Sequence, residues 1–383
     1  MKIGIVTCWQ PDDNYGTQIQ CFALQMYLRL LGHDAYLIRY KRFEDMVKPK
    51  MTFSRILKVF NPYIVLRHIY YMLLDKNRVK NMDLNDRKSP EFREKYLNMT
   101  DIFDSYQDLK DNPPQADLYI VGSDQVWNIT YEQNNNIGAH FLAFGKESTK
   151  RISYAASFGF SLEKLDIKYA KKIFPLLKAF AGISLRERSG IDICNTIAKI
   201  NNDELKSIQV CDPTMLLSAE QYLNLFNSEN VDISEEPYVF VYNIIAPSEL
   251  DIVKISEWAS ENNLKVVYTM GHGRSSKIDH IYPTVPQWVK LIANAKYVIT
   301  NSFHGTVFSL LFHKNCAVYP INIATSTNGR LETLVNLAEQ NFVVEKGNSF
   351  VDKLNITIDW NIFEKNKSVL RNQGIDYLNE FLL

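Results

Sequence analysis

Cysteine is scarce in this chain of 383 residues, and the cysteines that occur are not arranged in pairs. Five are scattered along the sequence with no Cys-x-x-Cys spacing: Cys8, Cys21, Cys194, Cys211 and Cys316. This spacing argues against a disulfide framework and against a zinc site, and it is typical of proteins in the reducing cytoplasm. We therefore expect a cytoplasmic protein that holds no metal.

An excess of charge and long apolar runs are also missing. Lys+Arg and Asp+Glu balance at 43 each, so the overall charge does not favour a nucleic-acid partner. No run approaches the roughly 18 apolar residues of a membrane span. The first residues, MKIGIVT, have the pattern of a strand and not of a signal segment. The length and a hydrophobic content of 46% indicate two domains, each with its own core.

The first forty residues have the pattern of a βαβ unit, which implies a parallel sheet. A β-run at 2–7 is followed by helical spacing from Thr17 and by a second β-run at 34–40. The loop after the first strand lies at the edge where open α/β sheets bind ligands, and it contains Asn14, Tyr15 and Gly16. A turn glycine followed by a capping Thr17 explains the same residues equally well. The loop is not G-x-G-x-x-G, so the dinucleotide fingerprint is absent.

Further polar residues follow other predicted strands of the first half. Strands are predicted at 116–122, 151–157, 182–185 and 210–214. The residues at their ends are Ser123 and Asp124, with Trp127 nearby, then Arg186 and Asp212. The two aspartates suit the activation or orientation of sugar hydroxyls, but each also suits the capping of a turn, and for Asp212 we favour the cap.

A basic, aromatic segment at about 41–80 interrupts this pattern. It carries ten Lys or Arg residues against three acids, interleaved with Phe and Tyr. Basic and aromatic residues together on helices are typical of docking at an anionic membrane face. The alternative is an inserted helical hairpin with a solvated basic side, and peripheral membrane contact remains open.

A second α/β set follows a polar, acidic stretch at 226–237, which we interpret as the linker. Strands are predicted at 238–242, 265–269, 297–300 and 317–320, and helices at 248–262, 285–293 and 330–338. The domains are therefore expected at 1–225 and 238–350. The remaining segment, 351–383, contains a helix at about 365–381 that is expected to pack back on the first domain.

The stretch KYVITNSFHGTVFSLLF, 296–312, combines a buried strand with the start of a helix. Asn301 and Ser302 are capping residue types, so His304 and Gly305 lie where the strand ends and the helix begins. Free N–H groups and the helix dipole attract an anion there, and a histidine can supply a proton near neutral pH. A histidine that only closes the turn explains the stretch equally well.

Six motifs in this order make the chain resemble the polysaccharide pyruvyl transferase family: NYGTQIQCFALQ, DLYIVGSDQVWN, RISYAASFG, ISLRERSG, VCDPTMLL and VITNSFHGTVFSLLF. They span about residues 3–320. The resemblance implies an α/β, GT-B-like fold with two Rossmann-like parallel-sheet domains facing a cleft. It also implies transfer of a pyruvyl group from phosphoenolpyruvate to two sugar hydroxyls, forming a cyclic ketal. The acceptor implied is a repeat unit of a surface polysaccharide, such as capsule or exopolysaccharide, or its lipid-linked precursor.

The resemblance also assigns roles to residues. His304 is the implied acid/base and Arg186 the implied donor-binding residue. From their position we also expect Asn301, Ser302 and Gly305 at the donor site, because Asn301 and Ser302 can hydrogen-bond the histidine or the donor and Gly305 lets the backbone approach closely. Some relatives have an arginine where this chain has Ser302, so a second cation must come from elsewhere, and Arg330, Arg274 and Arg188 are candidates. The acceptor or cleft set is Asn14, Tyr15, Gly16, Ser123, Asp124, Trp127 and His272. Phosphoenolpyruvate is a co-substrate, and no cofactor or metal is required.

Two other functions fit the same fold. One is a GT-B glycosyltransferase that uses a nucleotide sugar, which nucleoside diphosphate release would reveal. The other is a non-catalytic scaffold of a polysaccharide assembly complex, which the missing arginine at Ser302 keeps open. The sequence names neither the acceptor sugar, nor the ketal positions and stereochemistry, nor the oligomeric state.

Overall fold

The fold is that of a computed structural model, in which the described residues are 1–10, 12, 14–41, 87–128, 137–231, 236–244, 250–271, 279–321, 328–345 and 347–382. Four of the predictions fall outside these ranges. They are the basic insertion beyond Lys41, part of the linker, and the two loop candidates His272 and Arg274.

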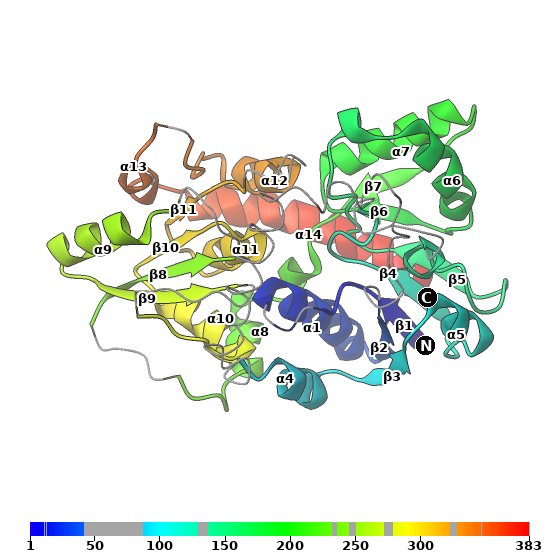
Figure 1. The fold of residues 1–383 in the computed structure, drawn as a ribbon, viewed down its shortest axis with the longest axis horizontal. Helices are drawn as coiled ribbons and strands as arrows, with labels where there is room; N and C mark the ends of the chain where they lie inside the picture. Colours follow the sequence, from blue (N-terminus) through cyan, green and yellow to red (C-terminus); the bar gives the residue numbers. More distant parts are fainter. Residues whose placement is uncertain are drawn as a thin grey trace, which may run out of the picture.

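The N-terminal half is built on a parallel sheet with the strand order β3-β2-β1-β4-β5 (Figure 1). Two further parallel strands, β6 and β7, continue the sheet, because single bridges join Ile152 to Gly182 and Ala156 to Leu185. The strands are β1 Lys2–Val6, β2 Asp34–Tyr40, β3 Met99–Phe103, β4 Leu118–Val121, β5 Lys150–Ser153, β6 Ile183–Leu185 and β7 Ser207–Gln209. Crossover connections between successive strands thus give the parallel sheet that the βαβ pattern predicted.

Helices connect these strands and cover the sheet. They are α1 Tyr15–Leu30, α4 Ser89–Tyr96, α5 Tyr106–Asp111, α6 Ile167–Lys178, α7 Arg188–Ile200 and α8 Ala219–Leu225, with 3-10 turns η3 Ile137–Phe141, η4 Leu162–Lys164 and η5 Pro213–Met215. Two local predictions were wrong. The side chain of Asn14 accepts from the N–H of Thr17, so α1 begins at Tyr15 and not at Thr17. The strand predicted at 210–214 lies at 207–209, because Asp212 caps η5.

The C-terminal half has its own parallel sheet, in the order β11-β10-β8-β9 (Figure 1). Its strands are β8 Tyr238–Asn243, β9 Lys265–Met270, β10 Tyr297–Thr300 and β11 Cys316–Val318, and its helices are α9 Ile252–Glu261, α10 Val285–Asn294, α11 Phe303–Leu311, α12 Asn328–Ala338 and α13 Phe350–Leu354. All six residues of β8 are buried, as expected for a central strand covered on both faces.

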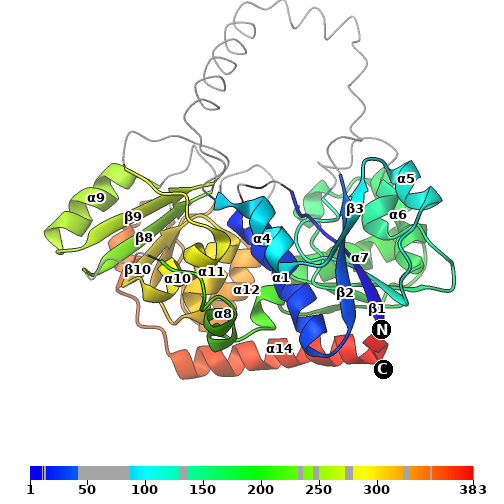
Figure 2. The same ribbon diagram turned by 90° about the horizontal axis from the view of Figure 1, so that it is seen from below.

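The last helix, α14 Trp360–Leu382, runs along both halves (Figure 2). Near its end the hydroxyl of Tyr377 donates to the carbonyl oxygen of Ser153, at 2.9 Å. Earlier along it, Nη2 of Arg371 donates to the carbonyl oxygen of Leu216, at 2.8 Å. These bonds attach the C-terminal helix to the N-terminal half.

The predicted linker is not a free polar segment. Its first residue, Phe226, is fully buried and packs 5.2 Å from the ring of Phe22. Nζ of Lys290 donates to the carbonyl oxygen of Glu229, at 2.6 Å, and the carboxylate of Glu229 pairs with Lys95. Apolar packing and these bonds therefore fasten residues 226–229 to both halves.

Aromatic packing joins the two halves directly. Tyr15 in α1 stacks on Trp288 in α10, with ring centroids 5.5 Å apart, and its hydroxyl donates to the carbonyl oxygen of Pro283. The buried Arg87 donates to the Tyr15 hydroxyl and to the carbonyl oxygen of Met270. Burial raises the pKa of Tyr15 to about 12, although the nearby Arg87 charge partly offsets this. Tyr15, which was expected in the acceptor or cleft set, is thus a buried residue of the interface between the halves.

Candidate functional site

Five side chains converge where the carboxyl ends of the strands of the two halves meet. From the N-terminal half, Ser123 and Asp124 follow β4, Arg186 follows β6, and Asp212 follows β7. From the C-terminal half, His304 follows β10 in the first turn of α11. The carboxyl edge of an open parallel sheet is where ligands bind, because loops and helix N-termini gather there.

Asp212 lies at the centre of this cluster. Its Oδ2 accepts from Nη1 of Arg186 and from the hydroxyl of Ser123, each at 3.0 Å. Its Oδ1 accepts from the backbone N–H and the hydroxyl of Thr214, at 3.0 and 2.7 Å. Asp212 therefore caps the turn, as we favoured from the sequence, but its second carboxylate oxygen also faces the site.

The charge of Asp212 is stabilised by its surroundings. Burial alone would raise the pKa of its carboxyl group, but the nearby His304 and Arg186 and the hydrogen bond from Thr214 hold that pKa well below its usual range. Asp124 behaves in the same way, since the positive charges near it outweigh its burial and lower its pKa. The site therefore contains two permanent negative charges near neutral pH.

Arg186 is enclosed by carboxylates. Its side chain is 2% exposed, and its nitrogens lie 3.0 Å from Asp212, 3.4 Å from Asp124 and 3.5 Å from Glu187. Burial alone would lower the pKa of the guanidinium, but these three carboxylates raise it above its usual value. The guanidinium carbon lies 4.7 Å from the ring centre of Phe303.

His304 lies in the first turn of α11 but does not cap it. The hydroxyl of Ser302 accepts from the N–H of Gly305, at 3.1 Å, and so provides the cap. Nε2 of His304 is 3.6 Å from Oδ2 of Asp212, and it has no hydrogen-bond partner among the described residues although the ring is buried. On the other side, the ring lies directly against Gly16 of α1. The imidazole therefore contacts both halves and keeps a nitrogen without a hydrogen bond.

The neighbours of His304 shape the turn that carries it. Oδ1 of Asn301 accepts from the N–H of Ile244, and its Nδ2 donates to Asn243, which ties the ends of β10 and β8 together. A Cβ atom on Gly305 would lie 2.8 Å from Oγ1 of Thr300, so this position requires glycine. With Ser302 occupied as the cap, these three residues position the turn that carries His304.

Arg330 enters the site from α12 of the C-terminal half. Its guanidinium carbon is 5.7 Å from the ring centre of Phe303, the ring that Arg186 also approaches. In the described part of the chain, no carboxylate lies within ion-pair distance of Arg330. Burial and the like charge of Arg186 lower its pKa, and Asp124, Glu187 and Asp212 only partly offset this.

Other predicted site residues lie elsewhere. Trp127 is completely buried, stacks on Phe141 at 5.3 Å and donates to the carbonyl oxygen of His140, so its prediction as a cleft residue was wrong. Arg188 is exposed at the start of α7, and Asn14 caps α1. Sequence reasoning did not name Glu187 and Phe303 as site residues. Their position directly beside Arg186 and His304 in the quoted motifs was the available signal.

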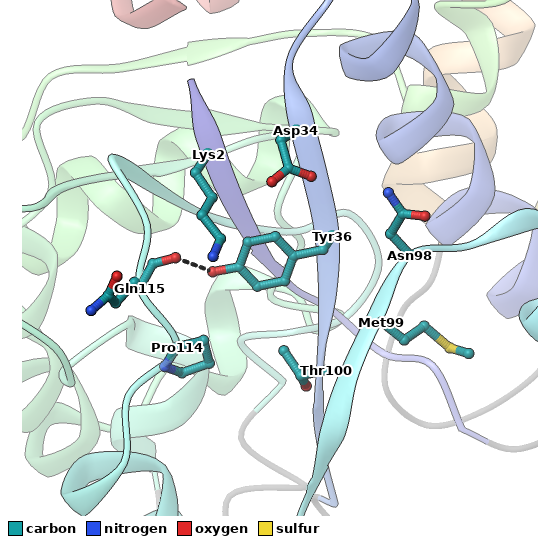
Figure 3. Close-up of a pocket in the computed structure, with 8 residues that line it drawn as sticks. All are labelled: Lys2, Asp34, Tyr36, Asn98, Met99, Thr100, Pro114 and Gln115. Atoms are coloured by element: carbon teal, nitrogen blue, oxygen red, sulfur yellow. Dashed lines mark hydrogen bonds between the residues drawn. The ribbon is translucent and has the colours of Figure 1, made fainter.

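A separate cavity of about 500 Å³ lies at the opposite, amino edge of the first sheet (Figure 3). There the hydroxyl of Tyr36 donates to the carbonyl oxygen of Gln115, and Lys2 lies 5.7 Å from the Tyr36 ring. None of the predicted site residues lines it; its walls are Lys2, Asp34, Tyr36, Asn98, Met99, Thr100, Pro114 and Gln115. The converging side chains therefore do not belong to this cavity.

Across the described ranges, no cluster of His, Cys, Asp and Glu side chains is grouped so that it could hold a metal ion. Within the same ranges, no helix combines the length and the apolar character needed to cross a bilayer.

Two solved structures of UDP-GlcNAc 2-epimerase from Methanocaldococcus jannaschii are similar to this chain. One is 14% identical to this chain; the matched region covers 98% of this chain and 100% of the epimerase chain, with a TM-score of 0.50. The other, in complex with UDP-GlcNAc and UDP, is 13% identical with the same coverage and a TM-score of 0.50. At this identity the likeness concerns the fold alone, and it confirms the predicted GT-B-like α/β architecture.

Among proteins with curated descriptions, none matches this sequence. The model of one family, described as polysaccharide pyruvyl transferase, matches residues 14–322. That range includes every element that contributes Asp124, Arg186, Asp212 and His304 to the site. The chain therefore belongs to the polysaccharide pyruvyl transferase family.

Proposed function

We propose that this protein transfers a pyruvyl group from phosphoenolpyruvate to two hydroxyls of a sugar, forming a cyclic ketal and releasing phosphate. The observation that carries the proposal is the buried His304, whose Nε2 lies without a hydrogen bond beside Asp212 at the first turn of α11. Family membership supports the pyruvyl transfer, and the chemistry of the site supports the donor.

The reaction needs a proton donor above the enol carbon of the donor. Protonation of C3 of phosphoenolpyruvate makes C2 electrophilic, and the first sugar hydroxyl adds there and loses its proton. Phosphate then leaves with the electrons of its C–O bond, and the second hydroxyl adds to the resulting oxocarbenium carbon and loses its proton. The donor and the diol thus become the ketal and hydrogen phosphate, with no redox change and no cofactor.

His304 fits the role of that proton donor. The ring lies beside the permanent charge of Asp212, with Nε2 3.6 Å from Oδ2, and this carboxylate orients the imidazole toward the site. After the proton leaves, the neutral ring can accept a proton from the attacking hydroxyl. The first turn of α11 and the adjacent cations offer charge stabilisation to the departing phosphate.

The acceptor that this function implies is a repeat unit of a surface polysaccharide or its lipid-linked precursor. Such an acceptor offers two neighbouring hydroxyls, and a lipid-linked one would lie at the inner face of the cytoplasmic membrane. Asp124, the more exposed of the two site aspartates, is the residue best placed to orient an acceptor hydroxyl.

The test is incubation of the purified protein with phosphoenolpyruvate and a panel of oligosaccharide acceptors, followed by mass spectrometry and a phosphate assay. We expect equimolar phosphate and an acceptor heavier by one pyruvyl group less one water. A matched incubation with nucleotide sugars is the comparison. Release of nucleoside diphosphate, with phosphoenolpyruvate unconsumed, would overturn the proposal in favour of a glycosyltransferase. Turnover of neither donor by a folded protein would favour a scaffold.

A further inference from the structure

We infer that Glu187 is a further catalytic residue of this site, whose carboxylate takes the proton of the second acceptor hydroxyl as the ketal ring closes. The inference rests on the proposed function and deepens it, because it names the group that receives that proton. It leaves the implied role of Arg186 at the donor unchanged.

Three buried side-chain atoms of the site form no hydrogen bond within the described part of the chain. They are Nε of Arg186, Oε2 of Glu187 and Nε2 of His304. Buried polar atoms are almost always hydrogen-bonded, so three such atoms at the ligand-binding edge of the sheets indicate that a ligand completes the site. His304 already has a part in the proposed reaction, whereas Glu187 has none.

The unpaired atoms of Glu187 and Arg186 are neighbours with opposite requirements. Oε2 of Glu187 lies 3.5 Å from Nε of Arg186, without a hydrogen bond between them. The arginine nitrogen can only donate a hydrogen bond, and an ionised carboxylate can only accept one. A sugar hydroxyl beside them can do both. The anionic oxygens of phosphoenolpyruvate can accept from Arg186, but they have no proton to offer Glu187, so the partner that Oε2 lacks is the acceptor.

The carboxylate of Glu187 is held in place through its other oxygen. Oε1 accepts from the hydroxyl of Ser157, at 2.5 Å, and that hydroxyl accepts from the N–H of Gly159, at 3.1 Å. The backbone N–H of Ser157 in turn donates to the carbonyl oxygen of Asp124, at 3.0 Å. Glu187 is therefore oriented by a residue that is itself fixed, which is the arrangement expected of a general base.

Glu187 has no capping role that would explain its position. It occupies the N-cap position of α7, but its side chain does not cap the helix. The start of α7 faces the C-terminal half, because a Cβ atom on Gly329 of α12 would lie 2.9 Å from Oγ of Ser189. The side chain of Glu187 is 6% exposed and that of His304 is 8% exposed, so a substrate reaches either group only when it is bound deep in the site.

The proton balance of the proposed reaction requires a second base. His304 gives one proton to C3 of the donor and recovers one from the first hydroxyl, so it is an imidazolium again and cannot accept from the second. When the second hydroxyl bonds to the oxocarbenium carbon, its proton becomes acidic and moves to Oε2 of Glu187. The proton then passes to the released phosphate, which leaves as hydrogen phosphate, and Glu187 returns to the carboxylate.

The other two carboxylates of the site are less suited to this step. Each oxygen of Asp212 already accepts two hydrogen bonds. Oδ1 of Asp124 accepts from Arg186, and the Asp124 side chain is 17% exposed. Ring closure must exclude water, because water would otherwise capture the oxocarbenium carbon. The enclosed carboxylate of Glu187 meets this condition better than that of Asp124.

The experiment measures phosphate, ketal and pyruvate in parallel for the wild type, Glu187→Gln and Glu187→Asp, with phosphoenolpyruvate and the panel of oligosaccharide acceptors. In Glu187→Gln the first steps should continue, but ketal formation should fall by roughly 10²-fold, the usual scale of acid–base catalysis. Water should then add to the oxocarbenium carbon and give a hemiketal that breaks down to pyruvate and free acceptor, so pyruvate should become the main product. Glu187→Asp restores a carboxylate and should recover part of the ketal.

Two further variants complete the comparison. Glu220→Gln is the matched control, since Glu220 is an exposed acid in the first turn of α8, and it should change no product. Ser157→Ala removes only the hydrogen bond to Oε1 and should shift the products toward pyruvate less than Glu187→Gln does. Thermal melting identifies a variant that does not fold, and if the Glu187 variants melt, the product ratio of Ser157→Ala decides.

A folded Glu187→Gln that forms ketal at a near wild-type rate would contradict the inference. The same holds if phosphate and ketal fall together without pyruvate, because the acid then only supports the structure of the site. An unchanged product ratio in Ser157→Ala, where the Glu187 variants do not fold, also counts against it. Failure of the proposed function is distinct from these outcomes, since the wild type itself then releases no phosphate from phosphoenolpyruvate.

Discussion

Gly16 and His304 touch across the boundary between the two halves. A Cβ atom on Gly16 would lie 2.2 Å from Nδ1 of His304 and 2.8 Å from Cγ, distances at which atoms cannot coexist. Gly16 belongs to the first turn of α1 and His304 to the first turn of α11, so two helix N-termini meet at the imidazole. The close approach of the two halves at this point therefore depends on the absence of a side chain at Gly16.

Gly16→Ala should lower kcat by roughly tenfold or more. The added methyl group must either push the imidazole away from Asp212 or separate the halves, and a loss of this size is usual when a catalytic group is displaced by about 1 Å. Steady-state kinetics and thermal melting are the measurements. Gly190→Ala is the matched control, because it is also in the first turn of a helix but its Cβ would meet only Leu185 at 3.4 Å, an ordinary contact. An active Gly16→Ala enzyme would show that the contact is not needed for turnover.

His304→Asn should fold but lose roughly 10²-fold or more in turnover, the usual scale of acid–base catalysis. The fold should persist because Ser302, and not His304, caps α11. Circular dichroism and the ketal assay together make the test, and Ser302→Ala, which removes the cap at a cost of about 1 kcal/mol, provides a comparison for stability. If His304→Asn melts while Ser302→Ala does not, the histidine is structural. If it folds and still forms ketal at a near wild-type rate, another group donates the proton, and His272 is the next candidate.

Asp212→Asn should destabilise the protein by about 3 kcal/mol near neutral pH, because it leaves part of the charge of Arg186 uncompensated. The pH dependence gives a sharper signature. The pKa of Asp212 is lower in the folded protein than its unfolded value of about 3.9, so its stabilising effect is complete above that pH and declines as the pH falls below it. Urea unfolding at several pH values should therefore show a steeper acid loss in the wild type than in Asp212→Asn. Parallel curves would mean that Asp212 is not strongly stabilised as a carboxylate.

The basic segment at about 41–80 should bind anionic vesicles at low salt and release them as salt is raised, because a surface attraction of this kind is screened. Sedimentation with phosphatidylserine-containing and with neutral phosphatidylcholine vesicles is the measurement. A variant with Lys48, Lys50, Arg55 and Lys58 changed to Gln is the control and should bind less. Equal recovery with both vesicle types at low salt would remove the membrane interpretation and favour a solvated basic surface.

The sequence determined the elements and the class of fold. Alternating apolar runs and helical spacing predicted the strands β1, β8 and β10 and the helices α1 and α11, because these signals are local and period-specific. The turn chemistry of Asn301 and Ser302 placed the start of α11 correctly, since capping depends on a few adjacent residues. The order of the motifs indicated the family that residues 14–322 match.

Only the tertiary structure decided which of these residues meet. Sequence spacing cannot tell that Gly16 packs against His304, since the two residues are 288 positions apart in the sequence. Nor can it tell that Trp127 lies in the core whereas Asp212 faces the site, because both follow similar buried strands and differ only in long-range packing. For the same reason, the charges that surround Arg186 and Arg330 could not be predicted from the sequence. A guanidinium is neutralised or left available by carboxylates from distant elements, and their distances exist only in the folded chain.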